Sequence, residues 1–94
     1  MINLSRFTCV NGVPVEEDVL NWAEGYFYTL MNIFSAFFTR VEVAETVERI
    51  SLIPFDELVR EELEGESPEI IQLAIARVQE LVAMELEVMQ AYIE

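Results

Sequence analysis

The densest chemical groups of this chain are the carboxylates between Asp56 and Glu69, a stretch with seven acidic residues and one arginine. Side chains three and four residues apart on a helix are neighbours at about 5–6 Å, which would align Glu57, Glu61 and Glu64. That spacing is of the same order as the rise of about 3.4 Å between successive nucleotides of a nucleic-acid strand. The segment is therefore predicted to present carboxylates that stand in for phosphates. The predicted partner-binding residues are Asp56, Glu57, Glu61, Glu62, Glu64, Glu66 and Glu69.

The composition of the whole chain is also strongly acidic. Its 94 residues include 18 aspartates and glutamates, five arginines and neither lysine nor histidine, which gives a net charge of −13. Such a surface attracts basic protein surfaces, and it lacks the basic patch that direct binding of nucleic acid needs. Two plainer explanations remain open: an acidic run is ordinarily a solvated helix face, and solubility or a high-salt habitat would favour the same excess.

Catalytic and metal-binding patterns find no support in the sequence. Histidine, the usual proton-transfer residue at neutral pH, and lysine, the residue of Schiff-base chemistry, are both missing, and so are the Ser-x-x-Lys and Gly-x-Ser-x-Gly motifs. Transition metals favour histidine or several cysteines, and the twelve-residue calcium loop is absent as well. We therefore expect no enzyme activity, no metal site and no cofactor.

The expected location is the cytoplasm, or the host cell cytoplasm if the protein is viral. Cys9 is the single cysteine, so no disulfide forms within the chain, and the first residues do not form a signal peptide. The uncharged stretch Gly25–Thr39 is shorter than the roughly 20 apolar residues that span a bilayer. We expect no membrane interaction.

Apolar spacing and helix-boundary residues predict the elements that position the acids. Gly65 suits the end of a helix, and Ser67 followed by Pro68 suits the start of the next. A Thr-x-x-Glu capping box at Thr39–Glu42 predicts another helix start at Arg40. Apolar residues then recur at spacings of three and four, and the helices are expected at Val15–Phe38, Arg40–Ile50, Pro54–Glu64 and Pro68–Ile93.

The N-terminal residues differ in pattern from the rest. The segment Phe7–Val10 is rich in strand formers, and Asn11-Gly12 is a hairpin turn signal, but Pro14 cannot donate to a strand ladder. We expect an extended arm packed on the helices, with a short hairpin as the alternative. The predicted fold is all-α, a compact bundle of about four helices in a single domain over residues 1–94.

The chain has more apolar residues than a bundle of this size needs, because 53% of its residues are hydrophobic. Seven of the ten aromatic residues lie between Trp22 and Phe38, and the last predicted helix carries two apolar rows. Large apolar surfaces are typical of obligate interfaces. A homodimer is therefore expected, with Tyr26, Leu30, Phe34, Phe37, Val82 and Met89 at its interface.

In size, acidity and helical content, the chain resembles the acidic nucleic-acid mimics that phages and mobile elements make against restriction enzymes and CRISPR effectors. The resemblance implies a small inhibitor or regulator that blocks a basic DNA- or RNA-binding surface on another protein. It rests on no shared motif, so no residue role is carried over from it. The alternative is a helical homo-oligomeric assembly or adaptor subunit without mimicry.

Overall fold

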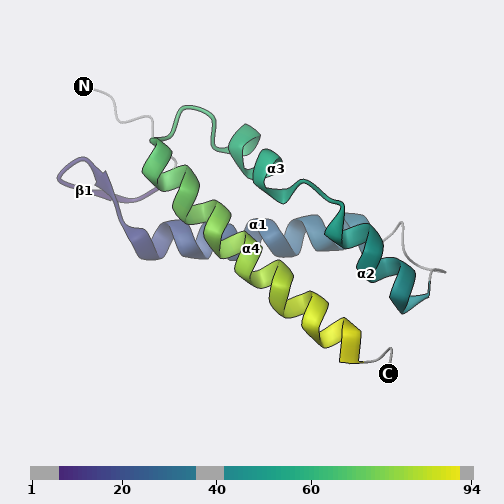
Figure 1. Ribbon diagram of the computed structural model, residues 1–94. Coiled ribbons are helices and arrows are strands. Elements are labelled where there is room, and N and C mark those ends of the chain that lie inside the picture. Colours follow the sequence, from purple (N-terminus) through teal and green to yellow (C-terminus); the bar gives the residue numbers. More distant parts are fainter. Residues whose placement is uncertain (1–6, 36–41, 92–94) are drawn as a thin grey trace.

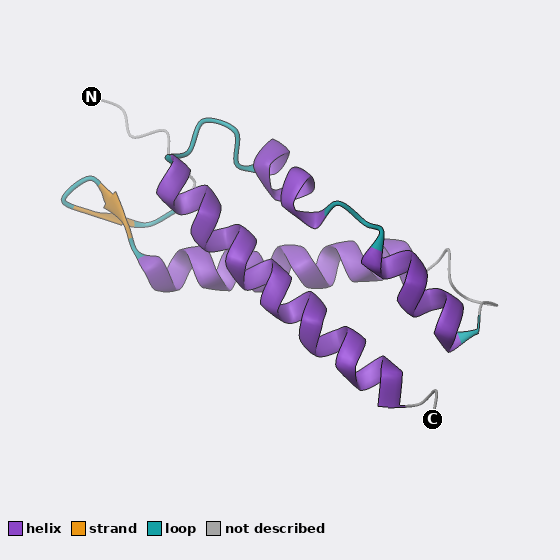
Figure 2. Cartoon of the chain, viewed as in Figure 1, coloured by secondary structure: helices purple, strands orange, loops and turns teal. Residues whose placement is uncertain are grey.

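The computed structural model describes residues 7–35 and 42–91, and within these ranges the chain is mainly helical (Figure 1). The helices are α1 (Glu16–Ser35), α2 (Val43–Ser51), α3 (Phe55–Glu62) and α4 (Pro68–Ala91). They follow a hairpin of two strands, β1 (Cys9–Val10) and β2 (Val13–Pro14), drawn in orange in Figure 2. The predicted four-helix content is confirmed. The predicted end of the first helix at Phe38 lies outside the described residues.

Helix α4 is the centre of the fold. It contacts α1, α2 and α3, while α2 and α3 follow one another along its length (Figure 1). One apolar cluster joins all four helices and the segment before β1, and no polar side chain of the described residues is fully buried in it. The core residues are Phe7, Val19, Ala23, Phe27, Leu30, Ile50, Phe55, Val59, Leu63, Ala74, Ile75, Val78 and Leu81.

The molecule is more elongated than the compact bundle that the sequence suggested. Its dimensions are 53 × 20 × 17 Å and its radius of gyration is 15.4 Å, against about 12 Å for a compact domain of this length. The accessible surface is 6631 Å², whereas a compact monomer of this mass exposes about 5,500 Å². The two short helices α2 and α3 cover successive parts of α4 instead of stacking into a further layer, so apolar surface remains exposed.

The boundary between α3 and α4 was predicted in its main features. Gly65 has a φ of +98°, which favours glycine. The Ser67 hydroxyl accepts a hydrogen bond from the Ile70 amide at 3.4 Å, the N-cap geometry expected before Pro68. The predicted end of α3 at Glu64 is wrong, however. The helix ends at Glu62, because Leu63 leaves the helical region with φ −98° and ψ 20°.

The start of α2 differs from the prediction. The helix begins at Val43 instead of Arg40, and Glu42 is its N-cap, with extended backbone angles of φ −62° and ψ 151° and no side-chain cap. Glu42 therefore cannot be the third helical residue that the capping box required, while Thr39 lies outside the described residues. The pattern Thr-x-x-Glu is short, and here the backbone turns later than it indicates.

The N-terminal segment forms the hairpin, which was the alternative to an extended arm. Asn11 and Gly12 both have positive φ, 54° and 79°, as a tight hairpin turn requires. Val10 pairs with Val13 and Cys9 with Pro14. Phe7, just before the hairpin, is buried and meets Trp22 edge to face at 6.1 Å, so an aromatic contact fixes this segment to α1.

Candidate functional site

An amphipathic pattern in and after α3 attaches the acidic residues between Asp56 and Glu69 to the core. Phe55, Val59 and Leu63 recur every four residues and are all buried. Positions four apart share one face of a helix, and most of the acidic residues between these three are exposed. The same short sequence therefore supplies both the apolar attachment and the outward carboxylates.

The carboxylates lie on α3, on the turn that follows it and on the first turn of α4. We call this stretch (Asp56–Glu69) the acidic segment. Glu57 and Glu61 are exposed one helical turn apart on α3. Glu64 is exposed in the turn that follows, where its amide donates to the Glu61 carbonyl at 3.4 Å. Glu69 lies in the first turn of α4, where the helix dipole favours a negative charge. The predicted single helical row of Glu57, Glu61 and Glu64 is therefore wrong for Glu64, which lies beyond the helix.

The other predicted members of the segment are also placed near the surface. Glu62 is exposed at the end of α3, and Asp56 and Glu66 are partly buried. The amide of Glu66 donates to the Leu63 carbonyl at 3.0 Å, which ties the turn to the buried anchor residue. The seven predicted carboxylates thus extend over a helix, a turn and the start of a second helix.

The described arginines are engaged with carboxylates of their own surroundings. Arg49 contacts Glu45 at 2.6 Å and Arg60 contacts Asp56 at 3.9 Å, each pair being four residues apart on a helix. Both pairs are well exposed and are worth little energetically. The acidic segment holds seven carboxylates and one arginine, so it cannot neutralise its charge internally.

Arg77 makes the contact that sequence reasoning missed. Its guanidinium bonds Glu80 on its own helix at 2.7 Å and also Glu24 of α1 at 2.5 Å. The hydrogen bond to Glu24 is the largest cause that raises the pKa of Arg77; desolvation opposes it, and the charges of Glu24 and Glu80 add to the rise. Glu80 was predictable from its spacing on the helix. Glu24 lies 53 residues away in sequence, and no local pattern indicates it.

Tyr26 links α1 to the acidic segment. Its hydroxyl donates a hydrogen bond to the Leu58 carbonyl at 3.3 Å, and its ring stacks on Trp22 at 4.9 Å. Burial raises the pKa of the Tyr26 hydroxyl above its ordinary value of 10.0, and the negative charges of Glu62 and Glu61 raise it further. The tyrosine therefore lies close to the field of these two carboxylates and stays a neutral donor at physiological pH.

The residues predicted for an oligomer interface pack mostly within one chain. Leu30 is in the core, Phe34 meets Phe55 edge to face at 6.5 Å, and Val82 and Met89 pack against the core. Phe37 lies outside the described residues. The large apolar side chains that are exposed were not among the predicted interface residues: Val10, Val13, Tyr28, Ile33, Val43, Leu52, Met84 and Val88. Periodicity alone does not indicate which apolar row a neighbouring helix covers.

In the described parts of the chain, no group of three or more potential metal ligands could hold an ion. None of the helices there is both long enough and apolar enough to cross a membrane. Comparison with known protein families, curated proteins and solved structures found no match to this chain. The chemistry of its surface is therefore the basis on which a function can be argued.

Proposed function

We propose that this protein is an inhibitor or regulator that places its acidic segment on the basic, nucleic-acid-binding surface of another protein. The observation that carries the proposal is the arrangement of seven carboxylates and one arginine on a surface attached by three buried apolar residues. A backbone that is already fixed to the core needs no ordering on binding, which lowers the entropic cost of association. In this role the protein resembles a phage or mobile-element mimic of anti-CRISPR or anti-restriction type and acts in the host cytoplasm.

The proposal can be tested through the salt dependence of binding. Proteins retained on the immobilised chain at low salt are eluted with duplex DNA, identified and purified, and their affinity for the chain is measured at about 50 and about 300 mM salt. A mimic competes with DNA for its target and loses affinity as salt rises. Binding that is unchanged by salt, or that leaves DNA binding by the target intact, would contradict the proposal.

Matched charge variants separate the acidic segment from bulk acidity. Replacing Glu57, Glu61 and Glu64 by glutamine removes three exposed charges from the segment. The control replaces the exposed residues Glu16, Glu17 and Glu42 by glutamine and changes the net charge equally. We expect association to slow by about tenfold in the first variant and by much less in the control, because steering depends on local potential. Equal effects would assign the binding to net charge alone.

A second function has its own support in the structure. The accessible surface of 6631 Å² exceeds that of a compact monomer by about 1,000 Å², which is comparable with the roughly 800 Å² that each partner buries in a standard interface. A helical homo-oligomeric assembly or adaptor subunit would use this surface. The homodimer belongs to both proposals, since pairing doubles the acidic surface of an inhibitor. Sedimentation as a monomer at micromolar concentration would remove the assembly function.

A further inference from the structure

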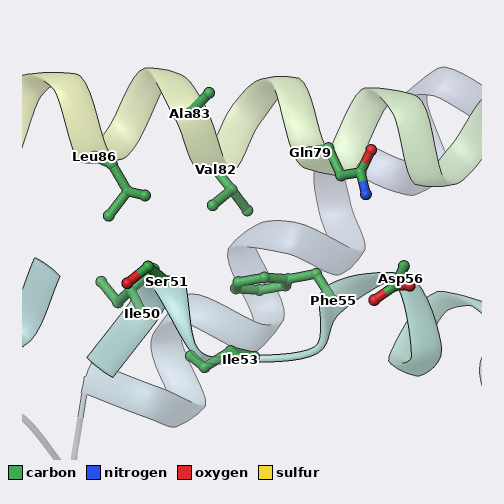
Figure 3. Close-up of a pocket in the computed structure, with 9 residues that line it drawn as sticks. All are labelled: Ile50, Ser51, Ile53, Phe55, Asp56, Gln79, Val82, Ala83 and Leu86. Carbon is green, nitrogen blue, oxygen red and sulfur yellow. The ribbon is translucent and has the colours of Figure 1, made fainter. Parts of the chain in front are cut away.

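An open groove of about 270 Å³ lies between α4 and the connection from α2 to α3. In Figure 3, Val82 and Leu86 point from α4 toward Ile50, Ile53 and Phe55 on the opposite side. Three polar side chains and one alanine complete the lining: Ser51, Asp56, Gln79 and Ala83. The groove has an apolar floor and polar groups at its edges.

The size of the groove favours side chains over a metabolite. Pockets for drug-sized ligands enclose about 300 to 1,000 Å³ and bury most of the ligand, whereas this groove is smaller and open on one side. Leu52, between two lining residues in the sequence, is an apolar side chain that is 78% exposed. An amphipathic helix that lays one or two apolar residues into a groove is a common way to use such a surface.

The charges around the groove are mainly negative, since Arg49, next to the lining residue Ile50, is paired with Glu45. Asp56 belongs to the lining and also to the acidic segment. Glu48, three residues before Ser51, and Glu87, four residues after Ala83, are exposed and lie by helical spacing beside lining residues. Arg60 contacts Asp56 at 3.9 Å, in a pair that is exposed on both sides and contributes little. The groove is therefore continuous with the acidic segment and shares its sign of charge.

We infer that the groove binds the apolar anchor residues of a cationic amphipathic helix in the partner protein. The inference rests on the proposed function and names the part of the partner that it engages. Charge complementarity selects this occupant, because an acidic helix of a partner would be repelled by the carboxylates at the rim of the groove. A second copy would bring another chain of net charge −13 to the same place. The acidic segment then speeds encounter, and the groove slows dissociation.

The test uses synthetic peptides of about four helical turns. The probe peptide carries leucine on one face and lysine on the others. One control peptide has the same composition with the leucines scattered, and another has glutamate in place of lysine. Binding of each labelled peptide is measured by fluorescence anisotropy at about 50 and about 150 mM salt. We expect the probe to bind at least about tenfold more tightly than either control, since both the apolar face and the charge contribute.

Two tryptophan substitutions locate the binding. Ala83→Trp places a large side chain at the edge of the groove, at an exposed position on α4, and Ala76→Trp places the same residue at an exposed position two turns earlier, in the separate groove between α1 and α4. We expect Ala83→Trp to weaken probe binding by about tenfold or more and Ala76→Trp to change it by about twofold at most. Unchanged helical circular dichroism confirms that both variants fold.

Three results would overturn the inference. Equal binding of the probe and the scattered-leucine peptide would show that charge acts without the groove, which leaves the proposed function standing. Equal binding of the lysine and glutamate peptides would show that binding does not require a cationic partner, and this result would count against the proposed function too. If Ala83→Trp instead converts a dimer to a monomer in sedimentation, a second copy of the chain occupies the groove.

Discussion

Leu63 is the residue whose loss tests most directly how the acidic segment is held. It is fully buried, with 0% of its surface exposed, directly after α3 and inside the turn that carries Glu64 and Glu66. Its amide bonds the Val59 carbonyl at 2.9 Å, and its carbonyl accepts the Glu66 amide at 3.0 Å. Shortening this side chain to alanine leaves the backbone bonds possible but removes the contact that seats the turn on the core.

The expected cost follows from the burial. Leu→Ala at a fully buried site costs about 3 to 5 kcal/mol, the sum of lost transfer energy and the cavity left behind. A domain of 94 residues has a total stability of about 5 to 14 kcal/mol, so the substitution removes a large share. Urea unfolding followed by circular dichroism measures the loss, and hydrogen exchange tests whether the amides of α3 open first. If Leu63→Ala does not fold, Leu63→Val, with an expected cost of about 1 kcal/mol, replaces it.

Leu52→Ala is the matched control, because it makes the same chemical change at a side chain that is 78% exposed. Its expected cost is below about 0.5 kcal/mol. The reasoning is refuted if the two alanine variants have the same stability, or if Leu63→Ala lies within about 1 kcal/mol of the parent protein.

Other expectations concern the turn, the helix start, pH and salt. Gly65→Ala should cost about 1 to 2 kcal/mol, because φ is +98° there, whereas Ser67→Ala should cost about 1 kcal/mol and Ser67→Asn much less; urea unfolding checks all three. Because the pKa of Tyr26 is raised in the folded protein, the protonated hydroxyl stabilises the fold. This contribution is complete below pH 10.0 and is lost as pH rises through the folded-state pKa. Unfolding measured from about pH 9 to 11 should show a decline that is reduced in Tyr26→Phe. Salt should raise the thermal midpoint, since it screens the repulsion among 18 acids that only five arginines offset; a midpoint that falls with added salt would show that attractive pairs dominate.

Local chemistry made much of the fold predictable. The pair Ser67-Pro68 located the start of α4, and Asn11-Gly12 indicated the hairpin turn that forms, since each depends on backbone preferences of the residues themselves. The seven acids could be assigned to the surface because a buried carboxylate needs a partner and the chain has few cations. The capping box at Thr39–Glu42 failed at Glu42, where the helix begins one residue later than that acid.

Features set by tertiary packing could not be predicted. Which apolar row of α4 is covered depends on where α2 and α3 lie along it, and α3 ends at Glu62 because Leu63 leaves the helical region. The bridge from Arg77 to Glu24 and the groove under Val82 and Leu86 both join elements distant in the sequence. The elongated shape results from the same packing. It could not be predicted from the helix lengths, because they are compatible with a compact arrangement as well.

The elongated shape changes what the net charge means for binding. The molecule is 53 Å long, whereas electrostatic interactions between exposed charges are screened beyond about 8 Å at physiological ionic strength. Acids at the start of α1 therefore contribute little to the potential near α3, and a partner responds to the local density of carboxylates instead of the total of −13. This density is high where Asp56 joins the acidic segment to the groove. A basic partner with apolar anchors binds both the acidic segment and the groove at that junction. The substitutions described above change these two contributions separately.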